Sequence, residues 1–234
     1  SFGAARRFSA DAAHELRTPL TILKGEIEVA LKASEAPAEI RQALLSCLEE
    51  VERLNSLVED LLLMARMEAN ALSARPTRVN LAQVLEDVAP ALGELATRAG
   101  NSYTVFPAPS LWVEGYDSLL FRLVFNLVEN AIKYTPAGGK IEVTLQQQNS
   151  SVVLEVKDNG PGIAADAQEH IFDRFYRGDP AREGSGTGLG LALVRSIVQL
   201  HQGNISLSST LGEGSCFRVT LPLAPGPSAG QTKD

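Results

Sequence analysis

The sequence predicts two domains, an α-helical hairpin followed by an α+β domain. From about residue 8 to 70 the apolar residues follow a helical period, and Gly25 is the only glycine. From about residue 103 onward, short alternating runs typical of strands are interleaved with helical patterns. The chain has 234 residues, 44% of them hydrophobic, which is long enough for each domain to bury a core of its own.

Two apolar stripes define the predicted hairpin. The first runs from Leu16 to Leu31 and predicts a helix that ends near Ser34–Pro37. The second alternates steps of four and three, the period of a coiled coil: Ile40, Leu44, Cys47, Val51, Leu54, Val58, Leu61 and Ala65. This register also predicts a buried Cys47 thiol. Because one hairpin cannot bury both stripes, we expect a homodimer in which two hairpins form a four-helix bundle.

The predicted domain boundaries follow from changes in this pattern. We expect the hairpin over residues 1–72, a linker at 73–78, the second domain at 79–224 and a disordered tail at 225–234. In the second domain, helices are expected at 81–96, 117–134 and 192–200. Strands are expected at 103–106, 140–147, 151–157, 204–209 and 215–221, with a hairpin turn around Asn149-Ser150. This mixed order, without regular βαβ repetition, favours an α/β sandwich with one sheet and helices on one face.

Composition excludes several classes of protein. The net charge of −7 argues against a nucleic-acid partner and against binding to anionic lipid, since both require a basic surface. No apolar run reaches the roughly 20 residues of a membrane span, and no signal peptide opens the chain. The chain begins with Ser1 rather than Met, so we expect a fragment. Two distant cysteines without zinc spacing indicate a reducing compartment.

His14 lies on the wrong face of the first helix for packing. At about 100° per residue it points away from the Leu16 stripe, and Thr18 shares its face one turn further on. Glu15 can hydrogen-bond one ring nitrogen and leave the other as a nucleophile, while Pro19 should kink the helix. An ordinary surface histidine explains the same geometry, so this feature alone leaves both interpretations open.

On the helix expected at 117–134, Asn126, Asn130 and Lys133 are spaced four and three apart on one face. They could belong to an ordinary solvated stripe. Asparagine is nevertheless a poor helix former, and its side-chain oxygen suits Mg²⁺ that is completed by substrate phosphates. Lys133 could then pair with a phosphate oxygen.

Two glycine-rich segments offer ligand contacts. The first, Asp158-Asn159-Gly160-Pro161-Gly162, follows an expected strand. It is either a plain tight turn or a segment that places the Asp158 carboxylate to accept a hydrogen bond from a purine amine. Gly184 to Leu191 runs into a helix and could bind phosphate through backbone N–H groups. No strand precedes it and the GK[ST] ending is absent, which argues against dinucleotide and Walker A loops. The charge-rich stretch between the two segments is long enough to form a lid over a bound nucleotide.

These segments together resemble the bacterial sensor histidine kinases. Phe8 to Leu20 looks like their H-box, Asn126 to Lys133 the N-box and Asp158 to Gly162 the G1 box. Phe172 to Phe175 resembles the F-box and Gly184 to Gly190 the G2 box. The ordered set covers about residues 8 to 223. It implies a dimerisation and histidine-phosphotransfer domain followed by an ATP-binding domain with the Bergerat fold.

The resemblance also implies roles. His14 would take the γ-phosphoryl group of ATP and pass it to an aspartate on a response regulator receiver domain, with Glu15 as acid/base partner. Thr18 would position water if the kinase also acts as a phosphatase. Asn130, with Asn126 nearby, would hold Mg²⁺. The implied ATP-binding residues are Asn126, Asn130, Lys133 on phosphate, Tyr134 against the base, Asp158 on the adenine amine, Gly160, Gly162, Phe175, Arg177 and Thr187, with Gly186, Gly188, Leu189 and Gly190 as backbone donors.

Asn126 also separates this chain from related ATPases. Gyrase and Hsp90-type chaperones resemble the fold but have a glutamate at this position, which activates water. An amide cannot act as a general base, so the site should hold ATP without hydrolysing it. Two alternatives remain: an ATP-hydrolysing enzyme of this fold, and a catalytically silent dimeric scaffold. The resemblance places the chain in the cytoplasmic portion of a bacterial inner-membrane sensor, with any membrane link made through upstream segments.

Overall fold

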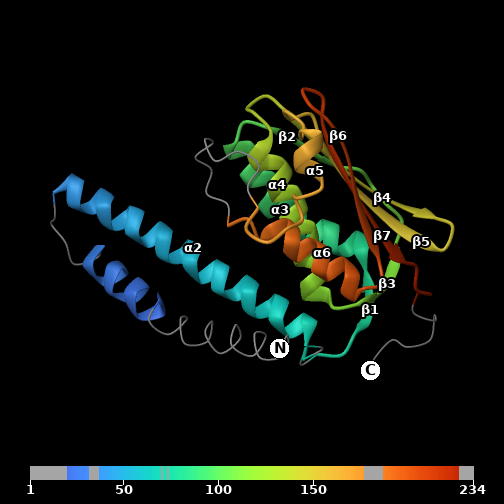
Figure 1. Ribbon diagram of the computed structural model, residues 1–234, viewed down its shortest axis with the longest axis horizontal. Coiled ribbons are helices and arrows are strands. Elements are labelled where there is room, and N and C mark those ends of the chain that lie inside the picture. Colours follow the sequence, from blue (N-terminus) through green and yellow to red (C-terminus); the bar gives the residue numbers. More distant parts are fainter. Residues whose placement is uncertain (1–19, 32–36, 70, 73, 177–186, 227–234) are drawn as a thin grey trace. The chain divides into compact units, whose positions relative to one another are not determined.

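The computed structural model describes residues 20–31, 37–69, 71–72, 74–176 and 187–226. The chain divides into two compact units, Ser1–Leu72 and Ser73–Asp234 (Figure 1). In the described residues, no helix is both long enough and apolar enough to cross a bilayer.

The first unit contains a helical segment over residues 20–31 and the long helix α2 (Ala38–Glu68). Leu20 packs against Val58 and Leu62, whereas Lys24 forms a 2.8 Å ion pair with Glu52. Residue numbers therefore rise along one helix as they fall along the other, so the helices are antiparallel. This confirms the predicted helical hairpin; of the connection predicted at Ser34–Pro37, residues 34–36 lie outside the described residues.

The apolar stripe of α2 is only partly covered. Val51 and Val58 are buried, but Ile40 is 53% exposed and Leu54 is 39% exposed. The prediction of a buried Cys47 is wrong for this chain, because its thiol is exposed. The described partner helix has only 12 residues and contacts one side of a helix of 31 residues, so it cannot cover the whole stripe.

A five-stranded sheet forms the centre of the second unit, in the order β2-β4-β5-β7-β6. Its strands are β2 (Ser102–Val105), β4 (Lys140–Gln148), β5 (Ser151–Asp158), β6 (Asn204–Thr210) and β7 (Gly214–Pro222). The pair β2–β4 is parallel and the other pairs are antiparallel. The predicted hairpin turn is confirmed, with Asn149 in the left-handed region at φ 54°.

A second sheet was not predicted. β1 (Thr77–Asn80) pairs antiparallel with β3 (Trp112–Gly115), so strand structure begins inside the segment 73–78 that was expected to be a linker. Two four-residue strands carry too short a pattern to be recognised without their partner. The N–H of Ala224 donates to the Trp112 carbonyl at 2.8 Å and adds a bridge to this sheet. Of the predicted tail, residues 227–234 lie outside the described part.

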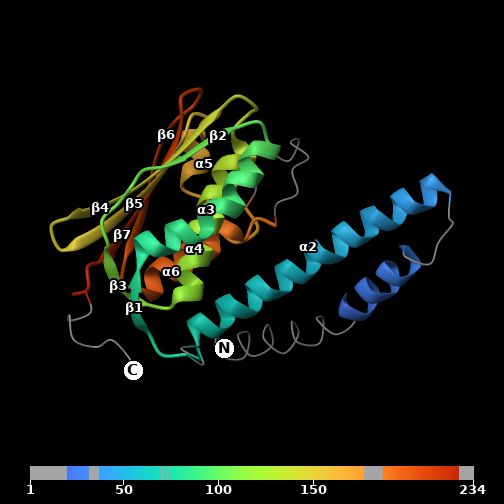
Figure 2. The same ribbon diagram turned by 180° about the vertical axis from the view of Figure 1, so that it is seen from behind.

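Three helices cover one face of the five-stranded sheet (Figures 1 and 2). They are α3 (Leu81–Arg98), α4 (Asp117–Tyr134) and α6 (Gly190–Leu200); α5 (Ala165–Gln168) is a single turn. Asn80 caps α3 by accepting a hydrogen bond from the Ala82 N–H. The core lies between these helices and the sheet, and its fully buried members include Leu120, Leu123, Leu127, Val156, Leu193 and Phe217.

His201 ties the end of α6 to the start of α4. Its Nδ1 lies 2.7 Å from the Ile197 carbonyl and its Nε2 accepts a 3.1 Å hydrogen bond from the Tyr116 N–H. This pattern requires a neutral ring with the proton on Nδ1. Burial lowers the pKa of His201 from its ordinary value, against the opposing effect of the Ile197 carbonyl. The neutral imidazole therefore acts as a structural cross-link between two helices of the unit.

Candidate functional site

α4 presents the predicted amide residues on its less buried side. Its opposite side is apolar and buried, which fixes the helix against the sheet and leaves Asn126 and Asn130 half-buried. The Asn126 side-chain oxygen lies 4.0 Å from the position that a Cβ would take on Gly190. The Asn126 Nδ2 atom is buried and has no hydrogen-bond partner among the residues that the structure describes. Asn126 therefore lies beside the first residue of α6 with a free donor.

The amino-terminal end of α6 has the properties of an anion site. Leu189, fully buried, anchors the end of the helix, and no side chain in the described part of the chain caps its first turn. The N–H groups of such a turn lack intrahelical partners and favour a negative charge. The Leu189 N–H is different, because it donates to Thr187 Oγ1 at 3.3 Å; this bond would have to break before Leu189 could serve a ligand.

The backbones of Phe175 and Gly188 are in contact next to this end of the helix. The Phe175 N–H donates to the Gly188 carbonyl at 2.9 Å. Glycine is required at position 188 for two reasons. A Cβ there would lie only 2.8 Å from the Phe175 Cα, and the backbone has φ +72°, in the left-handed region. Phe175 itself has φ 64° and is 57% exposed. A bulky residue in the left-handed region is a strained conformation of the kind found at functional sites.

Asp158 ends β5 as a buried carboxylate. Its Oδ1 accepts hydrogen bonds from the N–H groups of Gly160 at 2.8 Å and Ser215 at 3.3 Å. Burial raises the pKa of Asp158 above its ordinary value, while these two donors act in the opposite direction. Both described hydrogen bonds go to Oδ1, so Oδ2 is available to accept from a ligand.

The loop after Asp158 is held rigidly against the turn between β6 and β7. The Pro161 carbonyl accepts from the Gly212 N–H at 2.7 Å, and the Ile163 N–H donates to Ser209 Oγ at 2.8 Å. Gly162 has φ +69°, and a Cβ there would clash with the Thr210 carbonyl. This close backbone approach explains the second glycine of the segment.

The carboxyl-terminal end of α4 adjoins the same loop. A Cβ on Gly160 would lie 2.9 Å from Asp158 Oδ1 and 3.3 Å from the Tyr134 carbonyl oxygen. Tyr134 is 47% exposed, and the Lys133 Nζ lies 5.3 Å from the centre of its ring. Asn126 and Tyr134 are therefore about 12 Å apart along the helix axis, at 1.5 Å per residue. One end of α4 adjoins the anion site and the other adjoins Asp158.

The structure thus brings together three pairs of predicted residues: Asn126 with Gly190, Phe175 with Gly188, and Tyr134 with Gly160. His14, Glu15, Thr18, Arg177 and Gly186 lie outside the described residues. Two neighbours of Asp158 were missed. Ser215 reaches it through the register of β5 and β7. Thr135 lies close by, since a Cβ on Gly160 would be 2.9 Å from Asp158 Oδ1 and 3.4 Å from Thr135 Oγ1. The only signal for them was their position next to a predicted motif or strand end.

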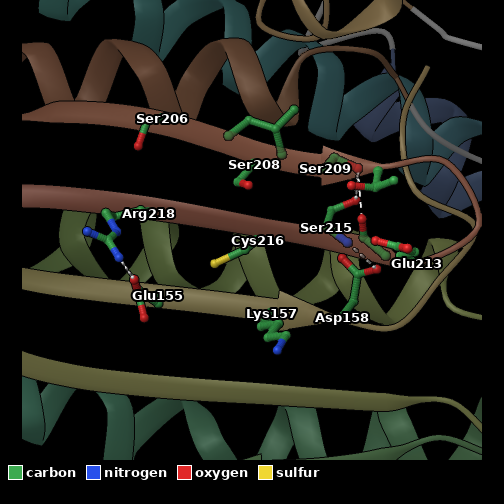
Figure 3. A pocket seen from close by; sticks show the side chains of 13 residues that line it. Glu155, Lys157, Asp158, Ser206, Ser208, Ser209, Glu213, Ser215, Cys216 and Arg218 are labelled. Atoms are coloured by element: carbon green, nitrogen blue, oxygen red, sulfur yellow. Dashed lines mark hydrogen bonds and ion pairs between the residues drawn. The ribbon is translucent and has the colours of Figure 1, made fainter. Parts of the chain in front are cut away.

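A hollow of about 720 Å³ lies mainly on the other face of the sheet, lined by β5, β6 and β7 (Figure 3). Glu155 forms an ion pair with Arg218 there, and burial raises the pKa of the Cys216 thiol. These residues alternate with Val156 and Phe217, which point into the core. Of the predicted site residues that the structure describes, only Asp158 lines the hollow, so we place the candidate site on the helix side of the sheet.

The site fits a magnesium–nucleotide complex. Among the described residues, no three His, Cys, Asp or Glu side chains gather as a metal site. A metal held there would depend on amide oxygens and on oxygens of the ligand, as Mg²⁺ with a nucleotide does. The unpartnered Asn126 Nδ2 and the uncapped turn of α6 add donors for phosphate.

Two family models match the chain. Residues 4–70 match the His Kinase A (phospho-acceptor) domain, and residues 115–225 match the histidine kinase-, DNA gyrase B- and HSP90-like ATPase. Sensor protein kinase PmrB of Pseudomonas aeruginosa is 43% identical over 222 residues, which are 94% of this chain and 46% of PmrB. Sensor histidine kinase CusS of Escherichia coli K12 is 39% identical over 92% of this chain and 45% of CusS. The chain spans about half the length of these curated relatives.

The solved structures that this chain resembles are also histidine kinases. Full-length ShkA in complex with AMPPNP superposes with a TM-score of 0.79 and 30% identity, over 95% of this chain and 47% of ShkA. The Acinetobacter baumannii histidine kinase AdeS has a TM-score of 0.66 and 27% identity, over 91% of this chain and 98% of that one.

Proposed function

Because this chain belongs to the sensor histidine kinases, we propose that it transfers the γ-phosphoryl group of ATP to His14, and then to an aspartate of a response regulator. In the first step a ring nitrogen of His14 attacks the γ-phosphorus and forms an N–P bond. The bond from that phosphorus to the bridging oxygen breaks, and ADP leaves. Glu15 takes up the imidazole proton.

The observation that carries this proposal is the order of the two matches in one chain. The phospho-acceptor model covers His14, and an ATPase model follows it. In the second unit, Asn126 and the uncapped turn of α6 offer donors where phosphates would lie, and Asp158 offers an acceptor at the other end of α4. Phosphoryl transfer depends mainly on positioning and charge neutralisation, which these groups suit.

Seven of the predicted ATP-site residues then have a task. Asn130, with Asn126, would hold Mg²⁺, which neutralises phosphate charge when bound. Lys133 would contact phosphate, Tyr134 would lie against the base, and Asp158 Oδ2 would accept from the adenine amine. The hydrogen bond between Phe175 and Gly188 would hold in place the amino-terminal end of α6, where the phosphates would bind.

Asn126 supports phosphotransfer over hydrolysis. Its amide cannot accept a proton from water, so ATP would persist until an imidazole reaches it. The alternative of an ATP-hydrolysing enzyme needs a general base in this position, and the catalytically silent scaffold gives no reason for the free donors around Asn126.

We further propose that the chain acts as a homodimer through the exposed apolar positions of its first unit. Ile40 and Leu54 belong to a stripe with coiled-coil spacing that the described residues of one chain leave partly exposed. A receiver domain would then dock on the helices around His14, and Thr18 would serve a phosphatase reaction on the same regulator.

Labelling with radioactive ATP tests the transfer. Incubation with [γ-³²P]ATP and Mg²⁺ should give a phosphoprotein that is labile in acid and stable in base. His14→Gln should lose the label while retaining nucleotide binding, whereas His170→Gln, at an exposed histidine, should be labelled normally. A fully labelled His14→Gln protein would disprove the acceptor assignment.

Replacement of Asn130 tests the metal site. Asn130→Asp puts a negative charge next to the phosphates, so labelling at limiting Mg²⁺ should fall at least tenfold while the dimer is unchanged. Unaltered magnesium dependence would remove Asn130 from the site. Sedimentation of the same samples checks the dimer.

A further inference from the structure

A buried histidine links the two helices that carry the proposed phosphate site. α4 carries Asn126, and α6 begins beside it at Gly190. At the other ends of these helices, His201 follows the last residue of α6 and Tyr116 precedes the first residue of α4. Residue numbers rise along one helix as they fall along the other, so the two helices are antiparallel.

The contact between His201 and Tyr116 is directional. His201 is 6% exposed, and its Nε2 accepts a 3.1 Å hydrogen bond from the Tyr116 N–H. The Tyr116 carbonyl in turn accepts from the N–H groups of Leu119 and Leu120, in the first turn of α4. The two rings also meet edge to face, with their centres 5.9 Å apart. Tyr116 is therefore bonded to the end of α6 through its N–H and to the start of α4 through its carbonyl.

Two further contacts hold the ring of His201 in place. Its Nδ1 donates to the Ile197 carbonyl at 2.7 Å, one turn back along α6. Gly115, buried at the end of β3, leaves room for the ring, because a Cβ there would clash with the His201 Cδ2 and Nε2 atoms. The ring is thus held by a partner on each nitrogen and by the backbone of β3.

This linkage and the phosphate site lie at opposite ends of the same helix pair. Tyr116 and Asn126 are about 15 Å apart along α4, and His201 and Gly190 are about 16 Å apart along α6, at 1.5 Å per residue. Apolar packing between the helices is non-directional, whereas a hydrogen bond tolerates only a narrow range of distance and angle. The bond between His201 and Tyr116 therefore fixes how far α6 extends along α4.

We propose that His201 is a positioning residue for the bound phosphates. Its bond to Tyr116 sets the register of α6 against α4, and so sets the distance between the first turn of α6 and Asn126. His201 itself touches no ligand and acts through the two helices. The inference rests on the proposed function in one respect, the binding of phosphates at this end of α6. Donors to a phosphate depend on exact placement, since a displacement of about 1 Å can cost about 100-fold in rate.

Two amide substitutions that differ in reach test the linkage. The side-chain oxygen of His201→Gln is as many bonds from the backbone as Nε2, so it can accept from the Tyr116 N–H. His201→Asn is one carbon shorter, so it can still donate to the Ile197 carbonyl but does not reach Tyr116. Calorimetric titration of the full chain with Mg²⁺–AMPPNP should show affinity about tenfold weaker for the asparagine variant, because the donors are displaced. The glutamine variant should bind like the parent.

AMP distinguishes positioning from general damage, because it has the base but lacks the two outer phosphates. The parent and His201→Asn should bind AMP equally in an NMR titration, which measures weak binding. Val153→Ala is the matched control for lost stability, since Val153 is buried on the sheet face away from the helices, and it should bind both nucleotides like the parent. Gly115→Ala displaces the ring from the side of β3 and should reproduce the asparagine result, so it decides the question if His201→Asn does not fold.

Three results would overturn the inference. They are equal weakening of AMPPNP and AMP binding by His201→Asn, which indicates a structural role, undiminished AMPPNP binding by that variant, and equal weakening in the asparagine and glutamine variants. If the parent binds neither nucleotide, the proposed function fails as well. Absence of label on His14 with normal nucleotide binding would instead contradict the phosphotransfer proposal alone.

Discussion

The two units of this chain differ in where their large apolar side chains lie. In the first unit Ile22, Val29 and Ile40 are each more than half exposed. In the second, Leu120, Leu123 and Leu127 are completely buried between α4 and the sheet. A pair of helices has one contact line, whereas helices on a sheet enclose a core between layers. The second unit therefore has a core of its own, and the first has apolar surface left for another molecule.

The second unit is incomplete in a different way. Its buried side-chain atoms without partners in the described residues are Tyr103 OH, Asn126 Nδ2 and Thr135 Oγ1. The last two belong to residues that adjoin Gly190 and Gly160 at the candidate site. The first unit also has one such atom among the described residues, Arg53 Nε. Exposed apolar surface thus characterises the unit proposed to dimerise, whereas unsatisfied polar atoms at the candidate site characterise the unit proposed to bind nucleotide.

The largest expected effect is on the stability of the second unit, through its buried core. Leu123→Ala should lower the free energy of unfolding of the second unit by about 4 kcal/mol, since Leu123 is fully buried and leaves a cavity. Leu54→Ala, at a 39% exposed position, should cost below about 1 kcal/mol in dilute monomer. Denaturant titration with Trp112, the single tryptophan, reports on the second unit, and helical circular dichroism reports on α2. Similar costs for both variants would contradict the contrast.

Charge on the open stripe should break the proposed dimer. Leu54→Glu would bury a carboxylate at the helix–helix contact, so the dimer dissociation constant should rise at least about 100-fold. Ser56→Glu, also exposed but two residues further round the helix, is the matched control and should dimerise normally. Analytical ultracentrifugation measures both. An intact Leu54→Glu dimer would move the contact to another surface.

The elements of both units could largely be predicted from sequence because their patterns are local. The bounds expected for α4 agree with Asp117–Tyr134, since the helix has one buried and one polar side. β1 and β3 were missed, because strands of four residues are specified by pairing between Thr77 and Gly115 rather than by period. Cys47 was misplaced because periodicity shows which face is apolar and does not show whether that face is covered.

The candidate site could be predicted only in its residue types. The motifs indicated Asp158 and Asn126, but the approach of Ser215 to Asp158 depends on strand register, and that of Thr135 depends on where α4 ends against the loop. Such contacts join residues far apart in sequence, so no local pattern encodes them. The roles of His14, Glu15 and Thr18 stay predictions.

Acid should weaken the second unit through His201. Because burial lowers the pKa of this ring, both folded and unfolded states are neutral above the ordinary value of 6.5. Below it the unfolded state takes up a proton that the folded state resists. Stability should therefore fall as the pH drops from about 6.5 toward the folded-state pKa. His201→Leu should cost about 2 kcal/mol at pH 7.5, since the Tyr116 N–H loses its acceptor.

Urea titrations at a series of pH values, followed by Trp112 fluorescence, measure this slope. His201→Leu should remove most of it. His170→Gln changes an exposed histidine beside Asp173 and should leave the slope in place. A parent protein whose stability is flat between pH 7 and 5 would show that the ring is not held neutral.

The smallest effect concerns the unpaired atom away from the site. Tyr103 lies beside Gly93, and its hydroxyl is buried with no hydrogen-bond partner in the described residues. Burial raises its pKa to about 12, because the phenolate is unfavourable there. Tyr103→Phe should therefore stabilise the second unit by about 1 kcal/mol, and the parent alone should lose stability as the pH rises from 10 toward 12. Tyr134→Phe, at an exposed ring, should give no gain in denaturant titration. A loss of stability in Tyr103→Phe would mean that this hydroxyl has a partner, and that unpaired polar atoms in this unit are confined to the proposed nucleotide site.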